Sequence, residues 1–258
     1  MGGNSNMKKL YTIPLIPLRG LTVFPNVVVH FDVGREKSTA AIEQAMLDEQ
    51  EIFLVGQKNS VVEEPNQDEI YSIGTICKIK QILKMSDNTI RVLVEGQERG
   101  KIVKYIEDEE DYIKVSVEKL SNKVVNNEEL DAYIKCLDKE FIKLLKLNEE
   151  NYGEFGKVIN YSEKPSDFVD MVASYAITDE KLKQEVLETV DLKKRAEKVL
   201  ERIKVENSIA KIQRKIANKV KNTVAKEQKD FYLREQIKAI QEELGEDDDE
   251  KKEIAKYE

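Results

Sequence analysis

Thr89-Ile90-Arg91-Val92-Leu93-Val94-Glu95 places Ile90, Val92 and Val94 on one face of an extended segment. A period of two residues is typical of a half-buried β-strand. Ser86-Asp87-Asn88, immediately before it, are turn formers, and the apolar-rich run 73–85 lies on their other side. The two runs and the turn between them predict a β-hairpin.

Further short strands are expected on both sides of this hairpin. Ile113, Val115 and Val117 alternate with polar residues, and the segments 27–29 and 52–55 are short and rich in β-formers. Residues 9–120 are therefore expected to form a small, mostly antiparallel barrel or folded sheet.

One helix is expected to interrupt these strands. Ser38 is a candidate N-cap. The apolar residues that follow it at helical spacing are Ala41, Ile42, Ala45 and Met46.

The periodicity becomes helical in residues 121–190. Apolar residues with the spacing of one helix face are Leu130, Tyr133, Ile134, Leu137, Phe141, Leu144 and Leu145. Further helices are predicted at 152–159, from a cap at Ser166 after Lys164-Pro165, and from Thr178 to Leu187. Together with the strands before them, these amphipathic segments predict an α+β fold with a compact helical bundle.

From Leu192 to Leu244 the sequence contains neither proline nor glycine, which predicts one long helix in the segment 191–245. Its apolar seam consists of Ile209, Ile212, Ile216, Leu233, Ile237, Ile240 and Leu244. The phase of the seam shifts near Val220 and Val224, as in a stutter. An unbroken helix would be roughly 80 Å long, so part of it is expected to project. The seam must then pack on a second copy, on a neighbouring subunit or on the bundle.

The same helix carries a basic stretch without any acidic residue between Asn207 and Lys226. The basic side chains considered for nucleic-acid contact are Lys211, Arg214, Lys215, Lys219 and Lys221. They form either a solvated helix surface or a phosphate-binding face. The stretch contains no aromatic residue that could stack on bases, which weakens a single-strand interpretation. Residues 246–258 follow as a tail that opens with the acidic run Glu246 to Glu250, to which no role is assigned.

Composition argues against catalysis and against a membrane partner. The 258 residues carry a net charge of -8, and no apolar run approaches the length of a membrane span. His30 is the only histidine, and no phosphate-binding GxxxxGK[ST] motif is present. Cys77 and Cys136 are far apart in sequence, so no metal site is expected. A reducing, cytoplasmic location is expected for the same reason. Residues 1–8 are interpreted as a flexible lead or tag.

The segment Pro17 to Asn26 combines prolines and a glycine with apolar residues. The candidate contact residues are Leu21, Val23, Phe24 and Pro25. Two interpretations remain open: the side chains fold under the barrel as core, or they form an apolar surface for an extended peptide.

Several motifs also carry a family resemblance. Pro17-Leu18-Arg19-Gly20, Val23-Phe24-Pro25 and Val33-Gly34-Arg35-Glu36-Lys37-Ser38 resemble the opening signature of Lon proteases. Ile90 to Gly96 is similar to a second strand of that family, and Phe231 to Gly245 to the segment that leads into its ATPase module. The resemblance spans roughly residues 10 to 245.

The resemblance implies a PUA-like β pseudobarrel over 9–120, a helical bundle and a long helix that precedes an AAA+ ring and a Ser-Lys protease domain. The sequence holds neither of these modules, so no cofactor is expected here; ATP and Mg²⁺ are implied for the full-length protein. The implied role is substrate recognition and assembly within a homohexamer that degrades unfolded or damaged proteins, with possible DNA association. The alternatives are a nucleic-acid-binding module and a purely structural oligomerisation scaffold.

Overall fold

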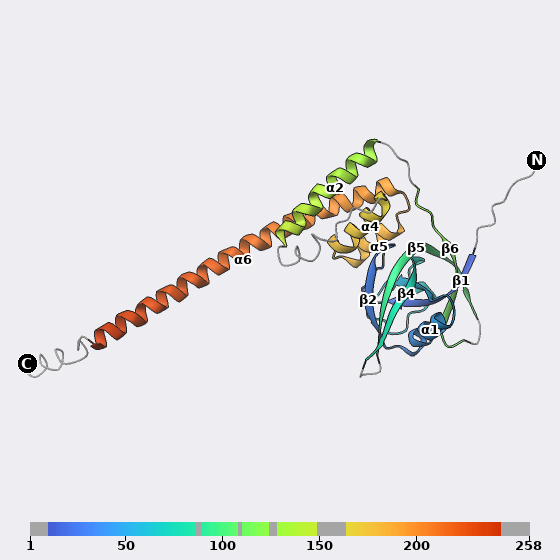
Figure 1. The fold of residues 1–258 in the computed structure, drawn as a ribbon, viewed down its shortest axis with the longest axis horizontal. Coiled ribbons are helices and arrows are strands. Elements are labelled where there is room, and N and C mark those ends of the chain that lie inside the picture. Colours follow the sequence, from blue (N-terminus) through green and yellow to red (C-terminus); the bar gives the residue numbers. More distant parts are fainter. Residues whose placement is uncertain (1–9, 86–88, 108–109, 124–127, 149–163, 244–258) are drawn as a thin grey trace, which may run out of the picture. The chain divides into compact units, whose positions relative to one another are not determined.

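The computed structural model describes residues 10–85, 89–107, 110–123, 128–148 and 164–243. The chain divides into two compact units, one reaching to Asn207 and one beginning at Ser208. The first unit holds a mixed six-stranded sheet and the helices that follow it in sequence, which confirms the α+β class (Figure 1).

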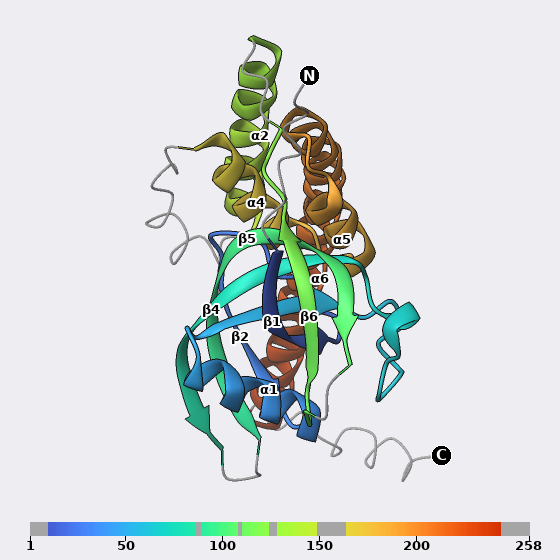
Figure 2. The same cartoon turned by 90° about the vertical axis from the view of Figure 1, so that its right-hand side faces the viewer.

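The sheet forms a pseudobarrel with the strand order β2-β5-β4-β3-β1-β6, closed by an additional pairing of β5 with β6. The strands are β1 (Leu10–Leu18), β2 (Val28–Val33), β3 (Glu51–Gly56), β4 (Ile73–Lys84), β5 (Ile90–Ile106) and β6 (Ile113–Lys119). β5 is the longest, with 17 residues: its first part pairs with β2 and its last part with β6, while β4 accompanies it on the other side (Figure 2).

The predicted hairpin is confirmed, since β4 and β5 pair in antiparallel fashion from Lys84 and Ile90 onward. Its turn residues 86–88 lie outside the described residues. Ile90, Val92 and Val94 are buried, as their alternation indicates. Burial of one face therefore fixes the register of this pair.

β1 was not predicted, because its two prolines favour a loop. It pairs in parallel with β3 and in antiparallel fashion with β6. The carbonyl of Leu18 accepts a hydrogen bond from Gln57, so the neighbouring Pro17 directs its nitrogen away from β3. The pairing with β6 stops at Leu15, so the N–H that Pro17 lacks is not needed by any described strand.

α1 (Glu36–Leu47) covers the core that these strands enclose, with Ala41, Ile42 and Ala45 buried. The prediction of Ser38 as its N-cap is wrong. Arg35 is the N-cap, and its side chain makes no capping hydrogen bond. Ser38 instead lies buried within the first turn of α1, which packs on β1.

The helical part consists of α2 (Glu128–Leu147), α4 (Pro165–Ala176), α5 (Glu180–Glu188) and the first turns of α6 (Leu192–Glu243). The helix predicted at 152–159 lies outside the described residues. α4 begins at Pro165 with Lys164 as N-cap, so the predicted cap at Ser166 is wrong: proline at the first helical position starts the helix one residue earlier. A ring contact between Phe141 and Tyr175 joins α2 to α4.

A buried ion cluster joins the sheet to these helices. Arg99 on β5 donates two hydrogen bonds, of 2.7 and 2.6 Å, to the carboxylate of Asp170 on α4. Arg195 on α6 places its Nε 3.1 Å from the same carboxylate. All three side chains are at most 2% exposed. Burial lowers the pKa of Arg195 to about 10, opposed by the charge of Asp170. The cluster therefore joins the sheet to α4 and α6, and removing one of its charges would leave the others unpaired in a dry interior.

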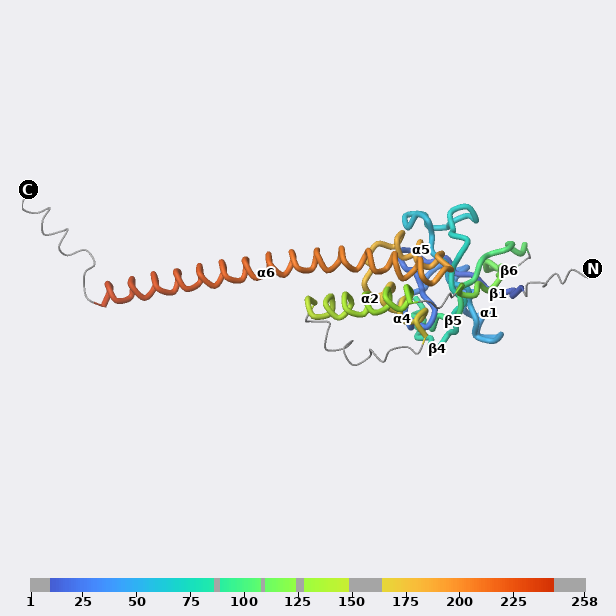
Figure 3. The backbone as a smooth tube through the Cα atoms, turned by 90° about the horizontal axis from the view of Figure 1, so that it is seen from above, coloured from blue at the N-terminus to red at the C-terminus, as the bar shows by residue number. Residues whose placement is uncertain are grey.

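The predicted long helix is a single helix of 52 residues over its described extent (Figure 3). From residue 211 onward every described residue of α6 is exposed. Among the helices of the described chain, none combines the length and the apolar character that crossing a membrane requires.

Candidate functional site

A groove of 660 Å³ brings two of the sequence motifs together. We call it the signature groove; it is lined by residues 15–19, 21, 31–38, 63–65 and 113. Residues 17–19 belong to the motif Pro17–Gly20 and residues 33–38 to the motif Val33–Ser38, so two segments separated in sequence line one site.

The groove follows from the way the barrel closes. β6 covers β1 only as far as Leu15, and β2 pairs only with the first part of β5. The end of β1 and the end of β2 consequently have no strand between them within the described sheet. Half-buried Leu21, Phe31 and Ile113 line this gap and give it apolar surface.

The predicted contact residues divide between this groove and the core. Val23 and Phe24 are at most 2% exposed, and Pro25 is buried as well. The hydroxyl of Thr75 donates a hydrogen bond of 2.6 Å to the carbonyl of Val23. Val23, Phe24 and Pro25 thus belong to the core, as the first of the two interpretations predicted. They do not form an exposed surface. Leu21 alone of the set lines the groove.

Close backbone packing holds this loop down. A Cβ atom at Gly96 would lie 2.1 Å from the carbonyl oxygen of Phe24, a distance that no side chain tolerates. Asn26, with a φ of 58°, turns the chain and donates its N–H to the carbonyl of Gly96. The loop is therefore anchored to β5 from Phe24 to Asn26, and only its start borders the groove.

Basic side chains attach the 63–65 segment as the outer wall of the groove. Arg19 donates a hydrogen bond of 3.1 Å to the carbonyl of Glu63, and Lys37 pairs with Glu64 at 3.3 Å. Arg35 donates to Gln57 at 2.7 Å, which in turn donates to the carbonyl of Val62. Burial and the nearby charge of Arg19 lower the pKa of Arg35. The wall is thus held by polar contacts, and the floor remains apolar.

β2 offers backbone groups beside the groove. Gly96 donates its N–H to the carbonyl of Val27, so by alternation Val29, Phe31 and Val33 bond to β5. The N–H and C=O groups of Val28, His30 and Asp32 therefore face the other side, where the described sheet has no further strand. His30, the only histidine of the sequence, has an exposed side chain on this strand.

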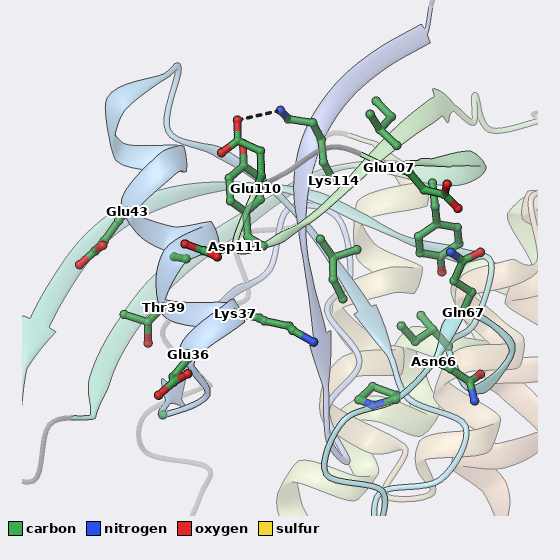
Figure 4. A pocket seen from close by; sticks show the side chains of 18 residues that line it. Glu36, Lys37, Thr39, Glu43, Asn66, Gln67, Glu107, Glu110, Asp111 and Lys114 are labelled. Atoms are coloured by element: carbon green, nitrogen blue, oxygen red, sulfur yellow. Dashed lines mark ion pairs between the residues drawn. The ribbon is translucent and has the colours of Figure 1, made fainter.

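A second, larger groove of 1070 Å³, whose side chains Figure 4 shows, shares lining residues with the first. We call it the acidic groove; it is lined by residues 34, 36, 37, 39, 40, 43, 65–67, 70, 105–107 and 110–114. Figure 4 shows Glu36 and Glu43 on α1 and Glu110 and Asp111 in the loop before β6.

The candidate residues on α6 are exposed. The seam residues Ile209, Ile212, Ile216, Leu233, Ile237 and Ile240 are all at least 40% exposed, while Leu244 lies outside the described residues. At 100° per residue, the basic residues 211–221 fall within an arc of about 160°, whose centre lies about 130° around the helix from the first part of the seam. The second part of the seam is rotated by about a quarter turn from the first, as the predicted stutter implies.

The described residues contain no cluster of three or more His, Cys, Asp or Glu side chains arranged to hold a metal ion. Burial raises the pKa of the Cys77 thiol, whereas Cys136 is exposed.

Comparisons with known proteins identify the family. Residues 12–205 match the family described as ATP-dependent protease La (LON) substrate-binding domain. The chain is 47% identical over 246 residues to a Lon protease of Clostridium acetobutylicum, covering 95% of this chain and 32% of that protein. It is 44% identical over 234 residues to Lon protease 1 of Bacillus subtilis, covering 91% of this chain and 30% of that protein. The chain thus spans about a third of the length of these relatives.

Solved structures agree on the fold. The N-terminal domain of the Mycobacterium avium complex Lon protease aligns with a TM-score of 0.61 at 19% identity, covering 75% of this chain and 98% of that one. A Lon N-terminal domain protein from Xanthomonas campestris aligns with a TM-score of 0.53 at 12% identity, covering 74% and 97%. From the sequence match over most of its length, the chain belongs to the family of Lon protease substrate-binding domains.

Proposed function

We propose that this chain captures unfolded or damaged proteins and presents them to the ATPase and protease modules of a longer Lon-type protein. The observation that carries the proposal is the signature groove, because the motifs that mark the family line an open site with an apolar floor. ATP and Mg²⁺ would act in those other modules, and this region would bind without catalysing. The cytoplasm is the proposed setting.

The chemistry of the groove suits a promiscuous receptor. Leu21, Phe31 and Ile113 offer apolar contact that accepts many side chains. The outward backbone groups of β2 could pair with an extended segment regardless of its sequence. Each site would be weak, which allows release for threading. A homohexamer would raise the overall affinity by ~10²–10⁴ where several sites engage one client.

Titration of the full chain with a permanently unfolded protein tests this proposal. Leu21→Ser removes apolar surface from the groove and is expected to weaken binding roughly tenfold. Val103→Ser removes a slightly smaller apolar side chain that is 50% exposed on β5, outside the groove, and serves as the control. Equal loss in both variants, or no binding by the parent chain, would refute capture at this groove. Circular dichroism of both variants verifies that they are folded.

Nucleic-acid binding is the second candidate, favoured by one observation: Lys211, Lys215 and Lys219 line one exposed helix face. Phosphate contacts release counterions, so binding through this face should weaken steeply between low and moderate salt. Capture at an apolar groove should change little over the same range. A purely structural scaffold would instead form oligomers without any affinity for unfolded protein.

A further inference from the structure

We infer that the acidic groove selects client segments that carry lysine or arginine next to apolar residues, an inference that rests on the proposed client capture. The two grooves share residues 34, 36, 37, 65 and 113. An extended segment whose apolar side chains occupy the signature groove would therefore continue directly into the acidic groove.

The charge of the acidic groove is unbalanced. Carboxylates from α1 and from the loop before β6 line it, namely Glu36, Glu43, Glu107, Glu110 and Asp111. Its only basic lining residues are Lys37 and Lys114, which pair with Glu64 and Glu110. Four of the carboxylates are exposed and form no ion pair within the described part of the chain. A client cation would therefore meet acceptors that no cation of the described chain already occupies.

The surface between these carboxylates suits the stem of a long basic side chain. Tyr105, Ile106 and Ile113 are half-buried and lie beside the acids. Lysine and arginine cover apolar surface with their methylenes while the charged end remains in water. Aromatic rings add a cation–π attraction for that charged end.

One lysine of the chain already adopts this arrangement. The ammonium of Lys114 lies 5.4 Å from the centre of the Tyr112 ring and 3.6 Å from a carboxylate oxygen of Glu110 (Figure 4). The groove thus accommodates an ammonium between a ring and a carboxylate. The carboxylates of Glu43, Glu107 and Asp111 line the same groove and are available to the basic side chains of a client.

Three peptides that share one apolar core and end in lysines, glutamines or glutamates test the inference on the full chain. We expect the lysine peptide to bind roughly tenfold more tightly than the glutamate peptide at low salt, with the glutamine peptide between them. The triple variant Glu43→Gln, Glu107→Gln, Asp111→Asn should reduce this preference to less than about twofold. It should leave binding of the glutamine peptide unchanged.

A matched control removes the same charge elsewhere. Glu227→Gln, Asp230→Asn and Glu235→Gln change exposed acids on α6 and should preserve the preference for lysine. Equal binding of the three peptides, or an equal loss of preference in both triple variants, overturns the inference while capture itself stands. Failure of all three peptides to bind refutes the proposed capture and this inference with it.

Discussion

Ile203 and Ile212 belong to the same helix, yet the first is 0% exposed and the second 60%. Ile203 lies in the unit that ends at Asn207, where apolar side chains and even charged groups are enclosed. Ile212 lies in the unit that begins at Ser208, where every described residue from 211 onward faces solvent. The first unit buries apolar side chains in a core of its own, whereas the apolar seam of the second unit could be buried only against another surface. The same residue type thus contributes to the core in one region and remains exposed to solvent in the other.

The largest expected effect comes from opening the ion cluster of the first unit. Asp170→Asn leaves Arg99 and Arg195 buried without their countercharge, which should lower the free energy of unfolding by about 3–5 kcal/mol. Urea denaturation followed by circular dichroism measures this loss. Asp32→Asn is the control, because Asp32 makes a similar two-bond contact with Arg91 but at an exposed position. A comparable loss in the two variants would contradict the importance of burial.

A smaller effect should follow from crowding the loop beneath the signature groove. Gly96→Ala would press a methyl group against the carbonyl of Phe24 and should lower the free energy of unfolding by about 1–3 kcal/mol. Gly34→Ala, whose methyl group would meet only a side-chain carbon at 3.5 Å, should change it by less than ~0.5 kcal/mol. Thermal unfolding of both variants makes the comparison. An unaffected Gly96→Ala variant would show that the loop is not tightly packed.

The smallest expected effect on stability lies in the second unit. Ile212→Ser combined with Ile216→Ser should change the free energy of unfolding of the first unit by less than ~0.5 kcal/mol, because both side chains are already exposed. If the seam associates chains, the mass measured by sedimentation equilibrium should fall for this variant. Lys211→Ser with Lys215→Ser, about 100° around the helix from these isoleucines, should leave the mass unchanged. An unaltered mass in the isoleucine variant would show that the seam does not associate chains.

Periodicity predicted the features that depend on neighbours in sequence. The hairpin of β4 and β5 and the length of α6 follow from alternation and from the absence of proline and glycine. β1 was missed because Pro14 and Pro17 argue against a strand, and only its place beside β3 and β6 makes those prolines acceptable. The long reach of β5 past Gly96 was missed as well, since its second part is polar.

The sequence predicted separate segments of the candidate site but not how they come together. The two motif segments were recognised in the sequence, but their meeting across one groove depends on how the barrel closes. Arg99 and Asp170 are separated by 71 residues, so no local pattern connects them. The burial of Val23 and Phe24 likewise reflects Thr75 and Gly96, which lie far along the chain. Loops that cross an apolar core look the same in sequence as loops that expose apolar side chains.

The pairing of the first strand with the last has a consequence for biosynthesis. β1 leaves the ribosome early, but its antiparallel partner β6 is complete only at Lys119. Arg99 gains its partner Asp170 only when α4 has been translated, and Arg195 joins the same carboxylate only with the start of α6. A nascent chain must therefore carry an unclosed barrel through much of its synthesis. During that interval the apolar interior of the barrel is exposed to solvent. A protein proposed to hold unfolded clients is then itself an unfolded chain with exposed apolar residues.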